Sequence, residues 1–218
     1  MADQIGDHAY NHPLAQPAAR VVVPTLVDIT GARSALDVGC GSGAWVKTLL
    51  DHGVAAMGVD APGMPASGLL IGDEHLHRHD LRKPLALGRR FDLVLCLEVG
   101  EHLPEQYAAT LVESLVRHSP VVVFSAAIPG QGGQGHVNEQ WQSYWAAIFA
   151  AHSYKPYDCL RRDLWEHPEV ARWYAQNTLL YADPDGPHCL TQAADDLPLD
   201  LVHPRLYAKL LSCPSPEW

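Results

Sequence analysis

The sequence is poor in positive charge. Lys and Arg together number 15 against 25 Asp and Glu, which gives a formal net charge of −10 at pH 7. Nucleic-acid-binding proteins generally neutralise phosphates with Lys and Arg, so this balance argues against general nucleic-acid binding. It leaves room for a local basic patch such as Arg161 and Arg162.

Paired cysteines, targeting signals and long apolar runs are also missing. The five cysteines are scattered and show no C-x-x-C spacing, which excludes a disulfide framework or zinc knuckle and predicts reduced thiols in the cytoplasm. The first 17 residues lack the basic region and apolar core of a secretory signal. No apolar run approaches the roughly 20 residues of a membrane-spanning helix, so we expect no membrane association.

What the sequence does contain is an alternation of strand and helix patterns between residues 34 and 154. Such alternation is typical of a parallel sheet with helices on both faces. In these sheets ligands bind beyond the carboxyl ends of the strands, where the strand order reverses. The predicted strands are residues 34–40, 54–60, 70–81, 91–99 and 120–128, and the predicted helices are residues 43–53, 105–119 and 138–154.

The flanking segments complete the expected organisation. Residues 20–30 fit a helix or a buried extended segment, because Pro24 weakens the helical interpretation. Residues 154–165 and 171–183 are predicted as an antiparallel pair of strands, and residues 201–211 as a last helix. We therefore divide the chain into an N-terminal arm or lid (1–20), one domain (21–184) and a Pro-rich C-terminal extension packed on it (185–218).

A glycine-rich turn follows the first predicted strand. Residues 35–43 read ALDVGCGSG, which fits the dinucleotide pattern G-x-G-x-x-[GA], and Asp60 lies about 20 residues further on. A nicotinamide cofactor is therefore one interpretation. Asp37 opposes it, because an acid beside a pyrophosphate would repel it. The turn suits better a cationic ligand without phosphate, such as S-adenosylmethionine.

Four motifs in order strengthen this interpretation: ALDVGCGSGAW, GVDA, RHDL and FDLVLCLEVGEHL. They resemble the successive motifs of class I S-adenosylmethionine-dependent methyltransferases, over roughly residues 35–181. The resemblance implies an α/β fold with a Rossmann-like, doubly wound, seven-stranded sheet and a C-terminal antiparallel hairpin.

The resemblance also implies the cofactor-binding residues. Asp37 would face the amino group of the cofactor, and Asp60 would accept both ribose hydroxyls. Asp80 would accept from the adenine amino group. The backbone would pass under the methionine at Gly39, Cys40, Gly41 and Gly43, carbonyls at Leu97 and Glu98 would hold the ammonium, and Ala61, His79 and Leu81 would lie beside the nucleoside.

The acceptor end of the site is predicted from "LEVGEH" and from a histidine that closes the glycine-rich loop of residues 129–135. Glu101, His102 and His136 are the candidate catalytic residues, with His102 as general base. Together with Glu98 they form a set suited to Mg²⁺, Mn²⁺ or Zn²⁺. The set resembles the metal site of small-RNA 2′-O-methyltransferases and ubiquinone-type O-methyltransferases. The alternative is that the acids cap a helix and His102 packs under a lid.

Other polar and aromatic clusters are interpreted as structural. His75, His77 and His79 would share one face of an extended strand, and they indicate an exposed edge more than a metal site. The aromatic side chains of Trp141, Tyr144 and Trp145 are predicted to be core, with one of them a possible wall of the acceptor pocket. Gln176 and Asn177 would lie inside an apolar strand, bonded to backbone or to a polar acceptor.

We therefore expect a methyltransferase that acts on a hydroxyl of a small polyhydroxylated or phenolic molecule, as a monomer or homodimer. The N-terminal arm would close over the cofactor, with Tyr10 as a contact. Three alternatives remain: a nicotinamide-dependent oxidoreductase, an RNA 2′-O-methyltransferase, and a cofactor-binding scaffold without turnover.

Overall fold

The architecture comes from a computed structural model, which describes residues 13–65, 67–186, 190 and 198–212. In this part of the chain seven strands form one sheet in the order β3-β2-β1-β4-β5-β7-β6. The strands are β1 (Ser34–Val38), β2 (Ala55–Asp60), β3 (Leu76–Arg78), β4 (Leu93–Leu97), β5 (Val121–Ser125), β6 (Lys155–Tyr157) and β7 (Leu179–Ala182).

The sheet is parallel from β3 to β5 and contains one reversed strand. β1 pairs in parallel with both β2 and β4, while β7 runs antiparallel to β5 and to β6. The chain moves outward from β1 to β3 and then returns to the centre at β4. The strand order therefore reverses between β1 and β4, which is where such sheets bind ligands. The predicted fold class is confirmed.

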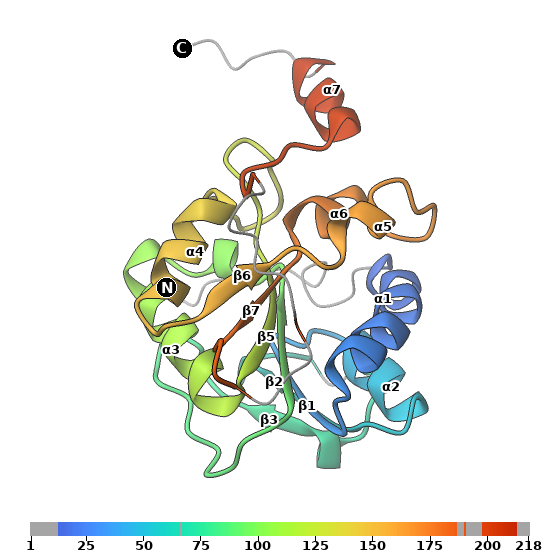
Figure 1. The fold of residues 1–218 in the computed structure, drawn as a ribbon. Coiled ribbons are helices and arrows are strands. Elements are labelled where there is room, and N and C mark those ends of the chain that lie inside the picture. Colours follow the sequence, from blue (N-terminus) through green and yellow to red (C-terminus); the bar gives the residue numbers. More distant parts are fainter. Residues whose placement is uncertain (1–12, 66, 187–189, 191–197, 213–218) are drawn as a thin grey trace.

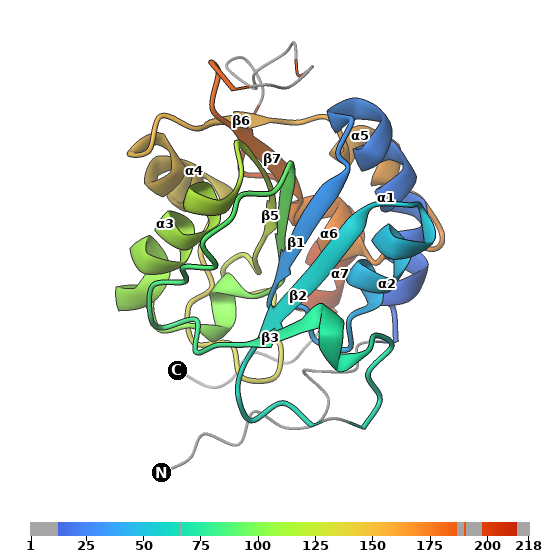
Figure 2. The ribbon, with the colours of Figure 1, turned by 90° about the horizontal axis from the view of Figure 1, so that it is seen from below.

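Helices cover both faces of the sheet, as Figures 1 and 2 show. The helices are α1 (Ala15–Thr30), α2 (Ala44–Asp51), α3 (Ala108–His118), α4 (Gln142–Ala150), α5 (Arg161–Leu164), α6 (Arg172–Asn177) and α7 (Pro204–Ser212), with 3₁₀ turns η1 (Asp73–His75), η2 (Gly100–His102) and η3 (Glu105–Tyr107). α1, α2, α5 and α6 pack on one face, and α3 and α4 on the other. Because both faces are covered, all five residues of β4 are buried.

Helix α1 settles the open interpretation of residues 20–30. It contains Pro24, buries Val22, Val23 and Leu26, and ends at Gly31 in the left-handed conformation. The helix begins at Ala15, so residues 15–20, which the sequence places in the arm, belong to it. Residues 1–12 of the predicted arm, Tyr10 among them, lie outside the described residues.

The C-terminal hairpin exists but is shorter than predicted. β6 and β7 pair antiparallel as expected. Residues 161–164 and 172–177, predicted as strand, instead form α5 and α6. Gln176 and Asn177 therefore end a buried helix and do not lie inside a strand.

The third predicted strand and the last predicted helix can also be compared with the structure. The third predicted strand shrinks to β3, and His75 belongs to η1, so only His77 and His79 stack on each other, with ring centroids 6.2 Å apart. The last helix is confirmed as α7. Within the described residues, no helix is long and apolar enough to cross a membrane.

Candidate active site

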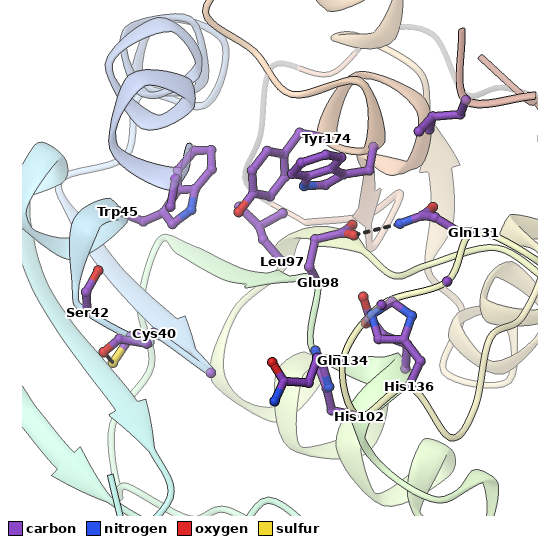
Figure 3. A pocket seen from close by; sticks show the side chains of 18 of the residues that line it. Cys40, Ser42, Trp45, Leu97, Glu98, His102, Gln131, Gln134, His136 and Tyr174 are labelled. Carbon is purple, nitrogen blue, oxygen red and sulfur yellow. Dashed lines mark hydrogen bonds between the residues drawn. The ribbon is translucent and has the colours of Figure 1, made fainter. Parts of the chain in front are cut away.

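A cavity of about 350 Å³ opens at the carboxyl ends of β1 and β4. Figure 3 shows its walls: the glycine turn after β1, the end of β4, the glycine-rich loop of residues 129–135, and helices α2 and α6. The lining side chains and glycines are Ala15, Gly39, Cys40, Gly41, Ser42, Trp45, Leu97, Glu98, Glu101, His102, Gln131, Gly132, Gly133, Gln134, His136, Trp173, Tyr174, Leu206 and Lys209.

The glycine turn lines this cavity with backbone. Gly39, Gly41 and Gly43 all have positive φ, at 81°, 51° and 79°. At Gly39 a Cβ would also collide with the side chain of Val99, so only glycine fits. The N–H groups of Gly39 and Cys40 both donate to the carbonyl of Val59, which ties the turn to β2. This arrangement brings bare backbone to the predicted cofactor, as the motif implies.

Two buried carboxylates lie behind the turn. Asp60 accepts from the N–H groups of Gly41 and Ala61, at 2.7 and 2.6 Å. Burial raises its pKa, and those two N–H groups oppose the rise. Asp37 is buried at the end of β1, and its Oδ2 has no hydrogen-bond partner among the described residues. Burial, followed by the charge of Asp60, raises the pKa of Asp37 to about 8.

Neither carboxylate lines the cavity, so their contacts with a cofactor stay predictions. The unpartnered oxygen of Asp37 fits a buried ligand cation, because an unpaired carboxylate in the interior is costly. Asp60 here supports the glycine turn with both oxygens, so it would have to share them to bind ribose hydroxyls.

The residues predicted around the nucleoside lie beyond β2 and β3 and do not line the cavity. Asp80 forms an ion pair with Arg82 at 2.9 Å, which lowers the pKa of this carboxyl. The His79 ring contacts the carbonyl of Lys83 at 3.1 Å. With Ala61 and Leu81, these roles stay predictions.

Glu98 stands at the end of β4 in an unusual backbone conformation. Its φ is 56°, in the left-handed region that non-glycine residues seldom adopt. Its carboxylate accepts from the amide groups of Gln131, at 3.3 Å, and Asn177, at 3.2 Å. Burial raises the pKa of Glu98, and its hydrogen bonds oppose the rise. The two amides fix the carboxylate in the cavity wall, and Figure 3 shows the bond from Gln131.

Glu101 in η2 is completely buried and unpartnered. It is 0% exposed, and neither carboxylate oxygen has a hydrogen-bond partner in the described part of the chain. Burial raises its pKa well above the usual range, and the nearby charge of Glu98 adds to this. The backbone N–H groups of Glu101 and Ala127 oppose the rise. A carboxyl buried in this way either carries a proton or binds a cation, so it is a candidate metal ligand.

Two imidazoles face this carboxylate. The Nδ1 of His102 lies 3.3 Å from the carbonyl of Gly135, and the Nδ1 of His136 lies 2.8 Å from a carboxylate oxygen of Glu139. Both partners can only accept, so each Nδ1 carries a proton and each Nε2 lone pair of a neutral ring is free. The rings meet edge to face with centroids 5.0 Å apart. Burial lowers the pKa of His102, and His136 beside it lowers it further.

Glu139 was not predicted, although it anchors this half of the site. Besides His136, its carboxylate accepts from the N–H groups of Gly130 and Gly132, at 2.8 and 2.7 Å. It therefore fixes both the ring and the glycine-rich loop. A carboxylate behind an imidazole is the usual support of a metal-binding histidine. The spacing of His136 and Glu139, three residues apart, was the available signal.

The structure brings three of the four predicted metal ligands together. One potential ligand atom each from Glu101, His102 and His136 lies within 4.8 Å of the others. Glu98 is not in this group. The unpartnered oxygens of Glu101 and the two free imidazole nitrogens fit a divalent cation, whereas His75, His77 and His79 form no such group among the described residues.

The aromatic wall of the cavity also differs from expectation. Trp145 is buried in the core against Phe124, and Trp141 is exposed, so neither lines the cavity. Trp45 of α2 and Tyr174 of α6 form the wall instead, with their rings 5.6 Å apart, and Trp173 adds to it. Trp45 and Tyr174 lie more than 120 positions apart in the sequence, so no local pattern predicts that they meet.

The sheet order, the glycine turn at the point of reversal and the acidic strand ends define a class I S-adenosylmethionine-dependent methyltransferase. Comparison with known proteins agrees. The family described as "Methyltransferase domain" matches residues 10–167, so the chain belongs to that family. This membership favours a methyltransferase over the alternative of a nicotinamide-dependent oxidoreductase.

A relative found by sequence is also a methyltransferase. A ubiquinone biosynthesis O-methyltransferase from Alkalilimnicola ehrlichii is 30% identical over 132 residues, which are 55% of this chain and 47% of that protein. The alignment thus spans about half the length of this curated relative.

Two solved structures share the fold at lower identity. Streptomyces venezuelae DesVI superposes with a TM-score of 0.60 at 17% identity, covering 79% of this chain and 93% of that one. CalS10, an amino pentose methyltransferase from Micromonospora echinaspora, gives a TM-score of 0.59 at 19% identity, covering 78% and 91%.

Proposed function

We propose that this methyltransferase transfers a methyl group to a hydroxyl of a small polyhydroxylated or phenolic acceptor. We further propose that Glu101, His102 and His136 hold a divalent cation beside that hydroxyl. The observation that carries the proposal is the convergence of three ligand atoms within 4.8 Å around a buried, unpartnered carboxylate. The curated O-methyltransferase relative supports transfer to oxygen.

The chemistry follows from the residues present. A divalent cation at this position would lower the pKa of an acceptor hydroxyl. Two imidazoles and one carboxylate suit Zn²⁺ or Mn²⁺ better than Mg²⁺. Gly135 and Glu139 hold the rings in orientation. The acceptor oxygen must also lie in line with the bond between the sulfonium sulfur and the methyl group, because methyl transfer is an in-line displacement.

A version without metal is also chemically complete. The lowered pKa of His102 keeps its ring neutral near pH 7, and its free Nε2 can accept the proton of the acceptor hydroxyl. In this version His136 and Glu101 orient the acceptor. The two versions predict different metal content and different sensitivity to chelation.

The test begins with the purified full chain. Bound metal is measured by mass spectrometry, and activity by formation of S-adenosylhomocysteine with catechol as probe. Chelation should remove both metal and activity, and Zn²⁺ or Mn²⁺ should restore both. Full activity in a verified metal-free sample would refute the proposal that a cation activates the hydroxyl, and it would leave His102 as the general base.

Two other functions give distinct results. Tight binding of S-adenosylmethionine without turnover on any hydroxyl probe would favour a cofactor-binding scaffold. Binding of short RNA with a steep salt dependence would favour an RNA 2′-O-methyltransferase, against the net charge of −10.

A further inference from the structure

Residues 198–203, which we call the strap, are hydrogen-bonded to α4, α5 and α6 and lead into α7. Buried Arg161 of α5 donates to the carbonyls of Leu199 and Pro198, at 2.7 and 3.1 Å. Asp200 accepts from the backbone N–H and the hydroxyl of Ser143 on α4, at 2.8 and 2.7 Å. The strap is therefore held by a buried cation and by side-chain bonds, as a defined part of the fold.

The strap is also bonded to the polar network of the active site. The backbone N–H of His203 donates to the Oε1 of Gln176 at 2.7 Å. Gln176 in turn donates to Asn177, which donates to the carboxylate of Glu98. His203 is 0% exposed, and its ring contacts the carbonyl of Trp165 at 2.8 Å. These bonds fix the point from which α7 starts.

Helix α7 then contributes to two adjoining cavities. Leu206 and Lys209 line the cavity of the active site and also a second cavity of about 330 Å³. Figure 1 shows α7 beyond the end of the sheet, next to α6. The two cavities meet along the glycine-rich loop and share Gln131, Gly132, Gly133, Leu206 and Lys209.

The second cavity has open space and a single charge. At Gly130 and Gly132 an added Cβ would meet nothing within 4 Å, so the loop leaves room there. Among the described lining residues, Lys209 is the only charged one, and the rest are apolar or amide side chains and glycines. Lys209 is exposed and has no ion-pair partner within the described part of the chain.

Charge is thus separated along the joined cavities. The inner end carries the carboxylates of Glu98 and Glu101, and the outer end carries the ammonium of Lys209. On a chain of net charge −10, an isolated cation facing a cavity selects for a ligand of opposite charge. The strap and α7 also lie outside residues 10–167, which match the methyltransferase family. Helix α6 and strand β7 of the sheet also lie beyond residue 167.

We propose that α7 forms the acceptor subsite and that Lys209 binds an anionic group of the acceptor, a carboxylate or a phosphate. The acceptor's hydroxyl then lies at the inner end, and its anionic group in the second cavity. This proposal rests on the proposed O-methyltransferase function. It assigns acceptor selection to the C-terminal extension.

The experiment compares Lys209→Glu with the wild-type chain on matched probes. The probes are dihydroxyphenylpropionate, its neutral amide, and dihydroxyphenylethyl phosphate. Arg205→Met is the control, because Arg205 lies on the same helix, pairs with Glu166 and lines neither cavity. KM and kcat are measured for each probe, and probe binding is measured separately in the presence of S-adenosylhomocysteine.

We expect Lys209→Glu to raise KM and the dissociation constant for an anionic probe about tenfold or more, with kcat nearly unchanged. The neutral amide should change less than about twofold, and Arg205→Met should leave all probes unchanged. A larger effect with the propionate identifies a carboxylate acceptor, and a larger effect with the phosphate ester identifies a phosphorylated one.

Other outcomes overturn the proposal. Equal effects on anionic and neutral probes would mean that α7 acts through structure alone. No effect on either anion would mean that Lys209 does not face the acceptor. Loss of binding for a short RNA, with the small anions unaffected, would assign the cation to a nucleic acid. Binding is read without turnover, so a chain that binds the anions through Lys209 yet methylates none would refute only the proposed function.

Discussion

The two halves of the site are built by different means. The half proposed to bind the cofactor, at the ends of β1 and β2, is a backbone turn held by one buried carboxylate, since Asp60 accepts from Gly41 and Ala61. The acceptor half consists of side chains from distant segments, and its central carboxylate, Glu101, has no partner in the described residues.

This difference indicates which positions in each half can accept a substitution. The turn at Gly39 tolerates no side chain, since a Cβ would collide with Val99, so the cofactor half is sterically fixed. In the acceptor half, position and charge come from single side chains such as His136 and Lys209, which substitution can alter without disturbing the sheet. Variants should therefore separate cofactor binding from acceptor chemistry, and the four below are ordered by expected effect.

Glu101→Gln should have the largest effect. It removes the only anionic ligand of the proposed cation site, and we expect metal affinity and kcat to fall on the order of 1000-fold, more than the 10–100-fold typical of losing a supporting residue. Affinity for S-adenosylmethionine, measured by calorimetry, should stay within about twofold. Glu105→Gln, at an exposed position just beyond η2, is the control. Unchanged metal content in Glu101→Gln would refute the site.

Glu139→Gln should come next. The glutamine amide is neutral, so it no longer places a negative charge beside the His136 ring. Metal affinity should therefore fall about 10–100-fold. Metal titration against a competing chelator measures this directly. The exposed Glu169→Gln is the matched control. If activity falls while metal affinity does not, Glu139 acts only by holding Gly130 and Gly132.

Asp37 predicts a pH dependence confined to the cofactor half. Its pKa of about 8 lies above the unfolded value, so the stability contributed by its protonated form is full below pH 4 and is lost as the pH rises through 8. A cationic cofactor binds the ionised form, so its affinity should rise about tenfold or more between pH 6 and pH 8.

Asp37→Asn should flatten both profiles, measured by calorimetry and thermal unfolding, while Asp73→Asn at an exposed site should change neither. A wild-type affinity that is independent of pH over this interval would contradict the assignment.

Asp80→Asn should have the smallest effect. If Asp80 accepts one hydrogen bond from adenine, its loss should weaken cofactor binding about 2–10-fold. Bound metal should be unchanged, since Asp80 lies on the cofactor side. An affinity identical to wild type would leave Asp80 as the partner of Arg82 alone.

The same contrast explains what could be read from the sequence. Asp37, Gly39 and Asp60 were predictable because strand, turn and acid follow one another within a short stretch, and local motifs record local geometry. The closeness of Glu101 and His102 follows from their adjacent positions for the same reason, and their catalytic roles stay predictions. The convergence of His136 on them depends on the loop of residues 129–135, whose path no local pattern fixes.

The misassigned segments have a physical cause as well. Residues 172–177 read RWYAQN, and their aromatic residues favour strand by composition, yet packing makes them helix α6. Contacts such as Asn177 with Glu98, 79 positions apart, depend on the completed sheet. The second cavity could not be predicted from the sequence either, because the position of α7 depends on the strap.

The strap has a consequence for how such a protein can diversify. All seven strands and the glycine turn precede residue 198, and the helix proposed to face the acceptor follows the strap, which is held by bonds to Arg161, Ser143 and Gln176. A lineage that kept these anchors could exchange the helix and acquire a new preference without rebuilding its chemistry.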